Sequence, residues 1–145
     1  MFKHILIPTD GSETSRNAVK AGIKFAKEAG AQVTGLYVCP AFHVLTYQVE
    51  MLEASKEKFS KESARRAIKY LAEIESEAKH AGVACDAVSV VSDRPYEEIV
   101  RAALQKRCDL IIMASHGRRG VKGILLGSET QKVLAHSTIP VLVYR

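Results

Sequence analysis

Short apolar runs alternate with segments of helical periodicity along the chain, and few folds accommodate this order. The strand-like runs are residues 2–8, 32–39, 84–91, 109–114 and 138–144. Between them, apolar residues recur at helical spacing in 12–29, 49–80, 95–106 and 128–136. Such alternation predicts a parallel sheet with helices on both faces. We therefore expect an α/β fold in which five parallel strands form a doubly wound sheet.

Several helix ends carry sequence signals. Ser12 predicts an N-cap for the first helix, and Gly30 predicts its C-terminal stop. Gly82 is expected to end the second helix in the same way. Asp93 followed by Pro95 predicts the start of the third.

Periodicity also predicts which helical residues face the core. In the second helix these are Leu52, Phe59, Ala64, Ala67, Ile68, Leu71, Ile74 and Ala78. In the third they are Ile99, Ala102, Ala103 and Leu104. Residues 41–48 fit neither period, so we expect a loop or lid there.

Length and composition favour a single globular domain over 1–145. No apolar run approaches the ~20 residues that a membrane helix requires, and the N-terminus does not read as a signal peptide. The expected compartment is therefore the cytoplasm, without a membrane partner. Cys39, Cys85 and Cys108 lack metal-ligand spacing, so we expect reduced, buried apolar residues.

The positive charge is concentrated near the C-terminus. The net charge is +5, and residues 101–145 contain eight basic and two acidic residues. No aromatic residues are interleaved with the basic ones, so we do not expect a nucleic-acid partner. A local patch for a small polyanion fits the distribution better.

The candidate binding residues follow from the sheet. A doubly wound sheet binds ligands beyond the carboxyl ends of its strands. The residues that directly follow the strands are therefore the first candidates: 9–11, 38–40, 92–93 and 115–117.

The segment 113–130 is rich in glycine and lies between a strand and a helix. Its glycines are Gly117, Gly120, Gly123 and Gly127, and Ser128 then begins the helix. Glycine allows close approach to a ligand, and free N–H groups at a helix start bind anions. Three cations in this segment, Arg118, Arg119 and Lys122, add positive charge, so it predicts a phosphate cradle. Neither GxxxxGK[ST] nor GxGxxG is present; a flexible connection with solvated arginines is the alternative.

Two long stretches resemble one known family. ILIPTDGSETSRNAV near the start and SHGRRGVKGILLGSETQKVLAHSTIPVLVYR at the end are similar to the universal stress proteins. Family members that bind ATP carry the pattern G-x2-G-x9-G-[ST]. This chain matches it at Gly117, Gly127 and Ser128, and departs from it at Ala114, which replaces the first glycine.

The resemblance implies a Rossmann-like, adenine nucleotide alpha hydrolase-like fold with strand order 3-2-1-4-5. It also implies a stress-response or regulatory module that binds ATP, ADP or AMP and hydrolyses ATP slowly or not at all. Asp10 would lie near the ribose and phosphates, with Mg²⁺ or Mn²⁺ accompanying them; a turn residue that caps the first helix is the alternative. Pro8 and Thr9 would line the base pocket, and Val38 would offer backbone groups to the adenine. The remaining nucleotide contacts would come from Ala114, Ser115, His116, Gly117, Arg118, Arg119, Gly120, Gly127, Ser128 and Thr130.

Other functions remain open. Ala114 favours a dimerising scaffold with a weakened nucleotide site, and a nucleotidyl-transfer enzyme of the same architecture would need a second substrate pocket. A phosphorylated receiver domain would need an acidic pair, but Asp10 stands alone. We expect no catalytic residue: adjacent loop residues such as Ser115 and His116 rarely face each other, and no third residue is evident to orient the imidazole.

The last strand predicts assembly. Residues 140–144 are apolar, and no helix follows to cover them. An exposed apolar edge strand invites pairing, so we expect a homodimer through this strand around a two-fold axis. The alternative is a monomer whose edge is shielded by residues 41–48.

Overall fold

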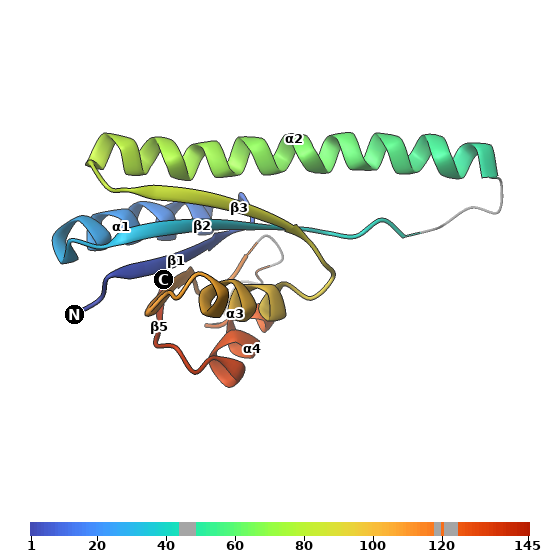
Figure 1. Ribbon diagram of the computed structural model, residues 1–145. Helices are drawn as coiled ribbons and strands as arrows, with labels where there is room; N and C mark the ends of the chain where they lie inside the picture. Colours follow the sequence, from blue (N-terminus) through green and yellow to red (C-terminus); the bar gives the residue numbers. More distant parts are fainter. Residues whose placement is uncertain (44–48, 118–119, 121–124) are drawn as a thin grey trace.

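The computed structural model describes residues 1–43, 49–117, 120 and 125–145 (Figure 1). Its strands are β1 (His4–Thr9), β2 (Gln32–Cys39), β3 (Cys85–Val91), β4 (Leu110–Ala114) and β5 (Val141–Tyr144). They form one parallel sheet in the order β3-β2-β1-β4-β5. The expected α/β class, strand order and parallel pairing are thus confirmed.

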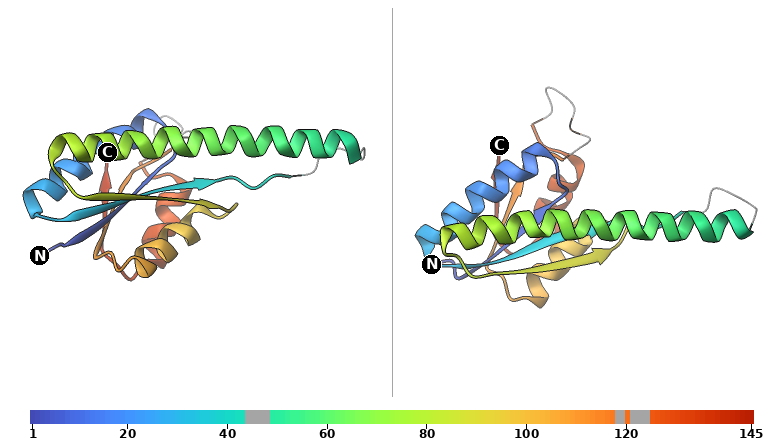
Figure 2. Two further views of the ribbon diagram at one scale, coloured as in Figure 1. Left: turned by 45° about the horizontal axis from the view of Figure 1, so that its top comes forward. Right: turned by 90° about the horizontal axis from the view of Figure 1, so that it is seen from above.

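Helices cover both faces of the sheet (Figures 1 and 2). They are α1 (Glu13–Ala29), α2 (Val49–Ala81), α3 (Pro95–Gln105) and α4 (Ser128–His136). Alternate β1 residues serve the two cores: Ile5 and Ile7 pack with α1 and α2, whereas Leu6 packs with α3 and α4. Because both faces are covered, the central strands are nearly continuous apolar runs. Among the described residues, no helix combines the length and apolar character needed to cross a membrane.

The predicted ends of α1 and α2 and the predicted start of α3 at Pro95 are confirmed. The Ser12 hydroxyl accepts a hydrogen bond from the Ser15 N–H at 3.2 Å. Gly30 and Gly82 have φ of 65° and 73°, the left-handed conformation that ends helices at glycine. Asp93 does not cap α3, because its carboxylate accepts the Ala41 N–H at 3.1 Å. The N-cap position belongs to Arg94, which makes no side-chain capping bond.

The predicted core face of α2 is only partly correct. The buried members of this face are Ala67, Leu71, Ile74 and Ala78. Ala64 is exposed, and Ile68 is 72% exposed. Ala64 and Ile68 lie within the packed stretch of α2 but beside its buried face, which Ala67 and Tyr70 share. Further toward its N-terminus, α2 extends past the sheet (Figure 2). There Phe59 packs instead on Phe42, with ring centroids 5.5 Å apart.

Two smaller expectations also fail. Leu104 on α3 is 55% exposed rather than buried, because it lies just beyond the edge of the face that carries Ile99 and Ala103. The last strand begins at Val141, not at residue 138. Before it, the Ser137 hydroxyl donates to the Ile139 carbonyl and accepts its N–H, which forms a turn.

Candidate functional site

A cavity of about 1060 Å³ lies at the carboxyl ends of the central strands. Most of the residues predicted for the site line it: Pro8, Thr9, Asp10, Val38, Ala114, His116, Gly117, Gly120, Gly127 and Ser128. They come from the ends of β1, β2 and β4 and from the start of α4. The fold therefore brings four separate segments together where a doubly wound sheet binds its ligands.

Ser115 and Thr130 are placed behind the cavity wall. Both are buried, with 1% and 3% of their surface exposed. The Thr130 hydroxyl donates to the Ala114 carbonyl at 3.0 Å, which ties the first turn of α4 to the end of β4. These two residues brace the site rather than line it. Arg118, Arg119 and Lys122 lie outside the described residues.

The Asp10 carboxylate braces the turn between β1 and α1. Its Oδ1 accepts the Ser12 N–H at 2.9 Å and the Ser15 hydroxyl at 2.8 Å. Its Oδ2 lies against Gly117, where an added Cβ would overlap the carboxylate. Glycine at 117 therefore allows the loop after β4 to pass directly over Asp10. Asp10 therefore both stabilises the turn before α1 and lines the cavity.

Gly127 joins the loop to the start of α4. Its N–H donates to the Ser115 carbonyl at 2.7 Å, and a Cβ at this position would lie 3.1 Å from the His116 Cα. Because Gly127 is the N-cap and has no side chain, it makes no side-chain capping bond. The first N–H groups of a helix have no acceptor within it. Since Gly127 and Ser128 line the cavity, this end of α4 can offer donors to an anion there.

His116 lies beside Ser115 in a way that the sequence reasoning did not expect. The Ser115 hydroxyl and His116 Nδ1 form a hydrogen bond of 3.0 Å, so the expectation that these neighbours do not face each other is wrong. Ser115 is nevertheless buried, so its hydroxyl is not accessible to a substrate. The bond orients the imidazole at the cavity wall.

Sequence reasoning missed the wall that α2 contributes. Tyr70 and Arg66 line the cavity together with Tyr37 from β2. The Tyr37 and Tyr70 rings meet edge to face, with centroids 5.3 Å apart. Burial raises the pKa of the Tyr37 hydroxyl, which stays protonated at neutral pH. No motif marks these residues, because only the way α2 lies on the sheet brings them to the cavity.

The rim of the cavity is fastened by Asp93. Besides the Ala41 N–H, its carboxylate contacts His43 Nε2 at 2.9 Å. The Ala41 hydrogen bond and then the His43 contact lower the pKa of Asp93, so the carboxylate is ionised at neutral pH. The segment after β2 is thus held against the end of β3. In the part of the chain that the structure describes, no three His, Cys, Asp or Glu residues are grouped to hold a metal ion.

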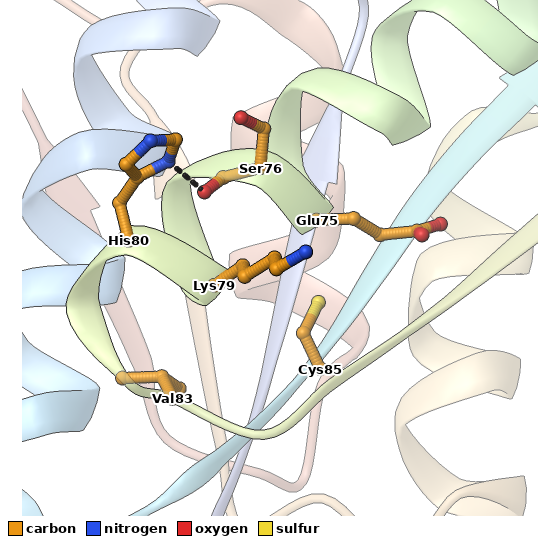
Figure 3. A pocket seen from close by; sticks show the side chains of 6 residues that line it. All are labelled: Glu75, Ser76, Lys79, His80, Val83 and Cys85. Atoms are coloured by element: carbon orange, nitrogen blue, oxygen red, sulfur yellow. Dashed lines mark hydrogen bonds between the residues drawn. The ribbon is translucent and has the colours of Figure 1, made fainter.

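A second hollow, of about 770 Å³, lies between the end of α2 and the start of β3. Figure 3 shows its lining residues Glu75, Ser76, Lys79, His80, Val83 and Cys85, with the His80 ring turned back to the Ser76 carbonyl of its own helix. Burial raises the pKa of the half-buried Cys85 thiol to about 11, so little nucleophilic thiolate forms at neutral pH. This hollow offers neither a glycine loop nor a helix start, and it is the weaker candidate.

Solved structures share this fold. The structure of protein MJ0577 of Methanocaldococcus jannaschii superimposes with a TM-score of 0.82 at 34% identity, over 99% of this chain and 95% of that one. A universal stress protein in complex with cAMP superimposes with a TM-score of 0.72 at 23% identity, over 99% of this chain and 97% of that one. A universal stress family protein of Arabidopsis thaliana with AMP bound superimposes with a TM-score of 0.67 at 14% identity, over 97% of this chain and 90% of that one.

Sequence comparisons agree. Universal stress protein MJ0577 is 35% identical over 156 residues, covering 100% of this chain and 96% of the relative. Universal stress protein MJ0531 of the same organism is 34% identical over 145 residues, covering 100% and 83%. The sequence model of the universal stress protein family matches residues 1–145. With the whole chain matched and the same fold formed, the chain belongs to the universal stress protein family.

Proposed function

We propose that this chain binds an adenine nucleotide, ATP above all, in the cavity at the carboxyl ends of β1, β2 and β4. The observation that carries the proposal is the junction of Gly117, Gly127 and the start of α4 beside Asp10. Glycines permit close approach there, and a helix start supplies donors for phosphate oxygens. Two proteins of this fold have been solved with cAMP and with AMP, which supports an adenine nucleotide as the ligand class.

The base would occupy the apolar side of the cavity. Val38, Ile99 and Met113 line that side and belong to the core beneath α3 and α4. Val38 is the penultimate residue of β2 and lines the cavity together with Pro8, and its backbone groups would meet the adenine edge. Such an apolar wall can pack against the planar face of the base, and a few polar groups are enough to orient it.

The phosphates would lie over Gly117, Gly127 and Ser128. Asp10 would lie beside them, and a Mg²⁺ or Mn²⁺ ion held there would take its other ligands from phosphate and water oxygens. A divalent ion would neutralise phosphate charge. Within the described residues we assign no general base to hydrolysis, and we expect ATP turnover to be slow or absent.

Calorimetry on the full chain tests the proposal directly. ATP, ADP and AMP are titrated with and without Mg²⁺, and the purified protein is denatured to identify any nucleotide that it released. Saturable binding of an adenine nucleotide supports the proposal. No binding, together with no released nucleotide, would instead favour the dimerising scaffold with a weakened site.

Ala114→Gly provides a test of the departure from the family pattern. Ala114 lines the cavity and is 8% exposed, so its methyl group occupies space near the ligand. The glycine variant is expected to bind ATP as well as the parent or up to about fivefold more tightly, because at most about 1 kcal/mol is gained. Calorimetry measures this change. A clear loss of affinity would show that the methyl group is a favourable contact.

We also propose that the protein acts as a cytoplasmic homodimer that pairs through β5. β5 is an edge strand, and Tyr144 at its end is 41% exposed. The segment after β2 contacts Asp93 near β3, at the opposite edge of the sheet, so its described part does not shield β5.

Val143→Lys tests the dimer. It would place a charge on the pairing strand, and we expect it to shift the dimer to monomer at micromolar concentration. Light scattering measures the mass, and circular dichroism verifies the fold. Lys132→Ala on α4, whose side chain contacts Glu129 and the Tyr96 ring, is the control. A lysine variant that stays fully dimeric places the interface elsewhere.

A further inference from the structure

One cation stands out in the cavity. Among the described residues that line it, Arg66 is the sole arginine or lysine. Three carboxylates share the lining, and each has donors of its own: Asp10 from Ser12 and Ser15, Asp93 from Ala41 and His43, Glu129 from Tyr96 and Lys132. Among the described side chains of the lining, carboxylates thus outnumber arginine and lysine, which gives Arg66 particular weight.

Arg66 is not committed to a strong ion pair. Its carboxylate contact is Glu62, one turn earlier on α2, at 3.8 Å. The two side chains are 47% and 44% exposed. A half-exposed pair at this separation contributes little, because water screens the charges and no short hydrogen bond forms. Turning the guanidinium away from Glu62 toward a ligand would thus cost little.

The guanidinium belongs to the wall that α2 contributes to the cavity. It sits beside the Tyr37 hydroxyl, whose pKa it lowers against the larger opposing effect of burial. Tyr70, one turn further along α2, packs on Tyr37 and lies against Gly11. Gly11 directly follows Asp10, which in turn lies against Gly117. This chain of contacts connects Arg66 to the site assigned to the phosphates.

We propose that Arg66 binds the outer phosphates of the nucleotide from the α2 side and thereby makes the cavity prefer ATP over AMP. The inference rests on the proposed function. A guanidinium presents its donors in a planar fork that matches two phosphate oxygens. Gly117, Gly127 and Ser128 would hold the phosphate common to both nucleotides. Arg66 would add a contact that AMP cannot make. The glycine loop and the start of α4 would thus bind any adenine nucleotide, whereas the α2 wall would favour ATP.

Arg66→Gln tests this role, with Arg65→Gln as its matched control. Arg65 is the preceding residue on α2, carries the same charge, is exposed and does not line the cavity. Calorimetry at constant ionic strength measures the dissociation constants of ATP and AMP for the two variants and the parent. Arg66→Gln is expected to raise the constant for ATP about tenfold and that for AMP less than about twofold. Arg65→Gln is expected to change both less than about twofold, because a remote charge is screened.

The possible outcomes are distinguishable. If the parent binds ATP but the two variants behave alike, Arg66 acts only through net charge and the inference is wrong. If Arg66→Gln weakens ATP and AMP equally, Arg66 does not contact the outer phosphates, and the inference is again wrong. If the parent binds no nucleotide, the proposed function itself fails and the inference falls with it. Because the side chain is half exposed, Arg66→Gln is expected to melt within a few degrees of the parent.

Discussion

Gly127→Val is expected to raise the dissociation constant for ATP about 100-fold or more. A Cβ at position 127 would lie 3.1 Å from the His116 Cα and 3.5 Å from the Ser115 carbonyl oxygen. The branched side chain of valine needs more room than this, so the start of α4 must move away from the end of β4. The N–H groups that would face the phosphates are then displaced or covered. Loss of several charge-assisted hydrogen bonds explains the size of the effect.

The control is Gly82→Ala at the far end of α2. Gly82 has φ of 73° and no atom within 4 Å of an added Cβ, so alanine there costs conformational energy of about 1 kcal/mol and disturbs no neighbour. This variant should bind ATP as the parent does, although it is less stable. Calorimetry gives the affinities and circular dichroism the fold. A folded Gly127→Val variant with the parental affinity would mean that the phosphates bind elsewhere.

The second large effect is on stability. Gly11→Ala is expected to lower the free energy of unfolding by roughly 2–4 kcal/mol. Gly11 has φ of 78°, a conformation that L-residues rarely adopt, and an added Cβ would overlap the ring of Tyr70. Tyr70 is 8% exposed and packs on Tyr37, so it cannot move aside without opening the core. Both the backbone conformation and the overlap therefore disfavour alanine.

Gly30→Ala separates these two causes. Gly30 also has a positive φ, 65°, but nothing lies within 4 Å of its added Cβ. We expect this variant to lose only about 1 kcal/mol, the conformational part of the cost. Urea denaturation of the two variants measures the difference, which is the cost of the overlap with Tyr70. Equal losses would show that the Tyr70 ring yields without cost.

The parts of the fold that could be predicted depend on local chemistry. Ser12 caps α1 because a hydroxyl at that position reaches an N–H of the first turn, and Gly30 ends it because glycine tolerates positive φ. The cavity at the strand ends could be expected because it follows from the winding of the sheet. The strand order itself was implied by the family resemblance and not by periodicity.

The parts that could not be predicted depend on how long elements lie on one another. Hydrophobic periodicity included Ile68 in the core of α2, but it cannot say which side of a 33-residue helix rests on the sheet, and Ile68 lies beside the buried face. For the same reason Arg66 carried no signal. Asp93 precedes the start of α3, but its carboxylate accepts the N–H of Ala41, which is 52 residues away in the sequence, so no local pattern could indicate this contact.

The projection of α2 beyond the sheet has a mechanical consequence. From Ser63, where burial begins, to Val49 the helix continues for about 20 Å at 1.5 Å per residue. The buried half of the same rod carries Tyr70, beside the cavity. A rotation of the rod by about 5° about its seat on the sheet would swing its N-terminal end by about 2 Å over that length. α2 thus has the geometry of a lever, with one arm that touches the binding site and another that extends past the sheet.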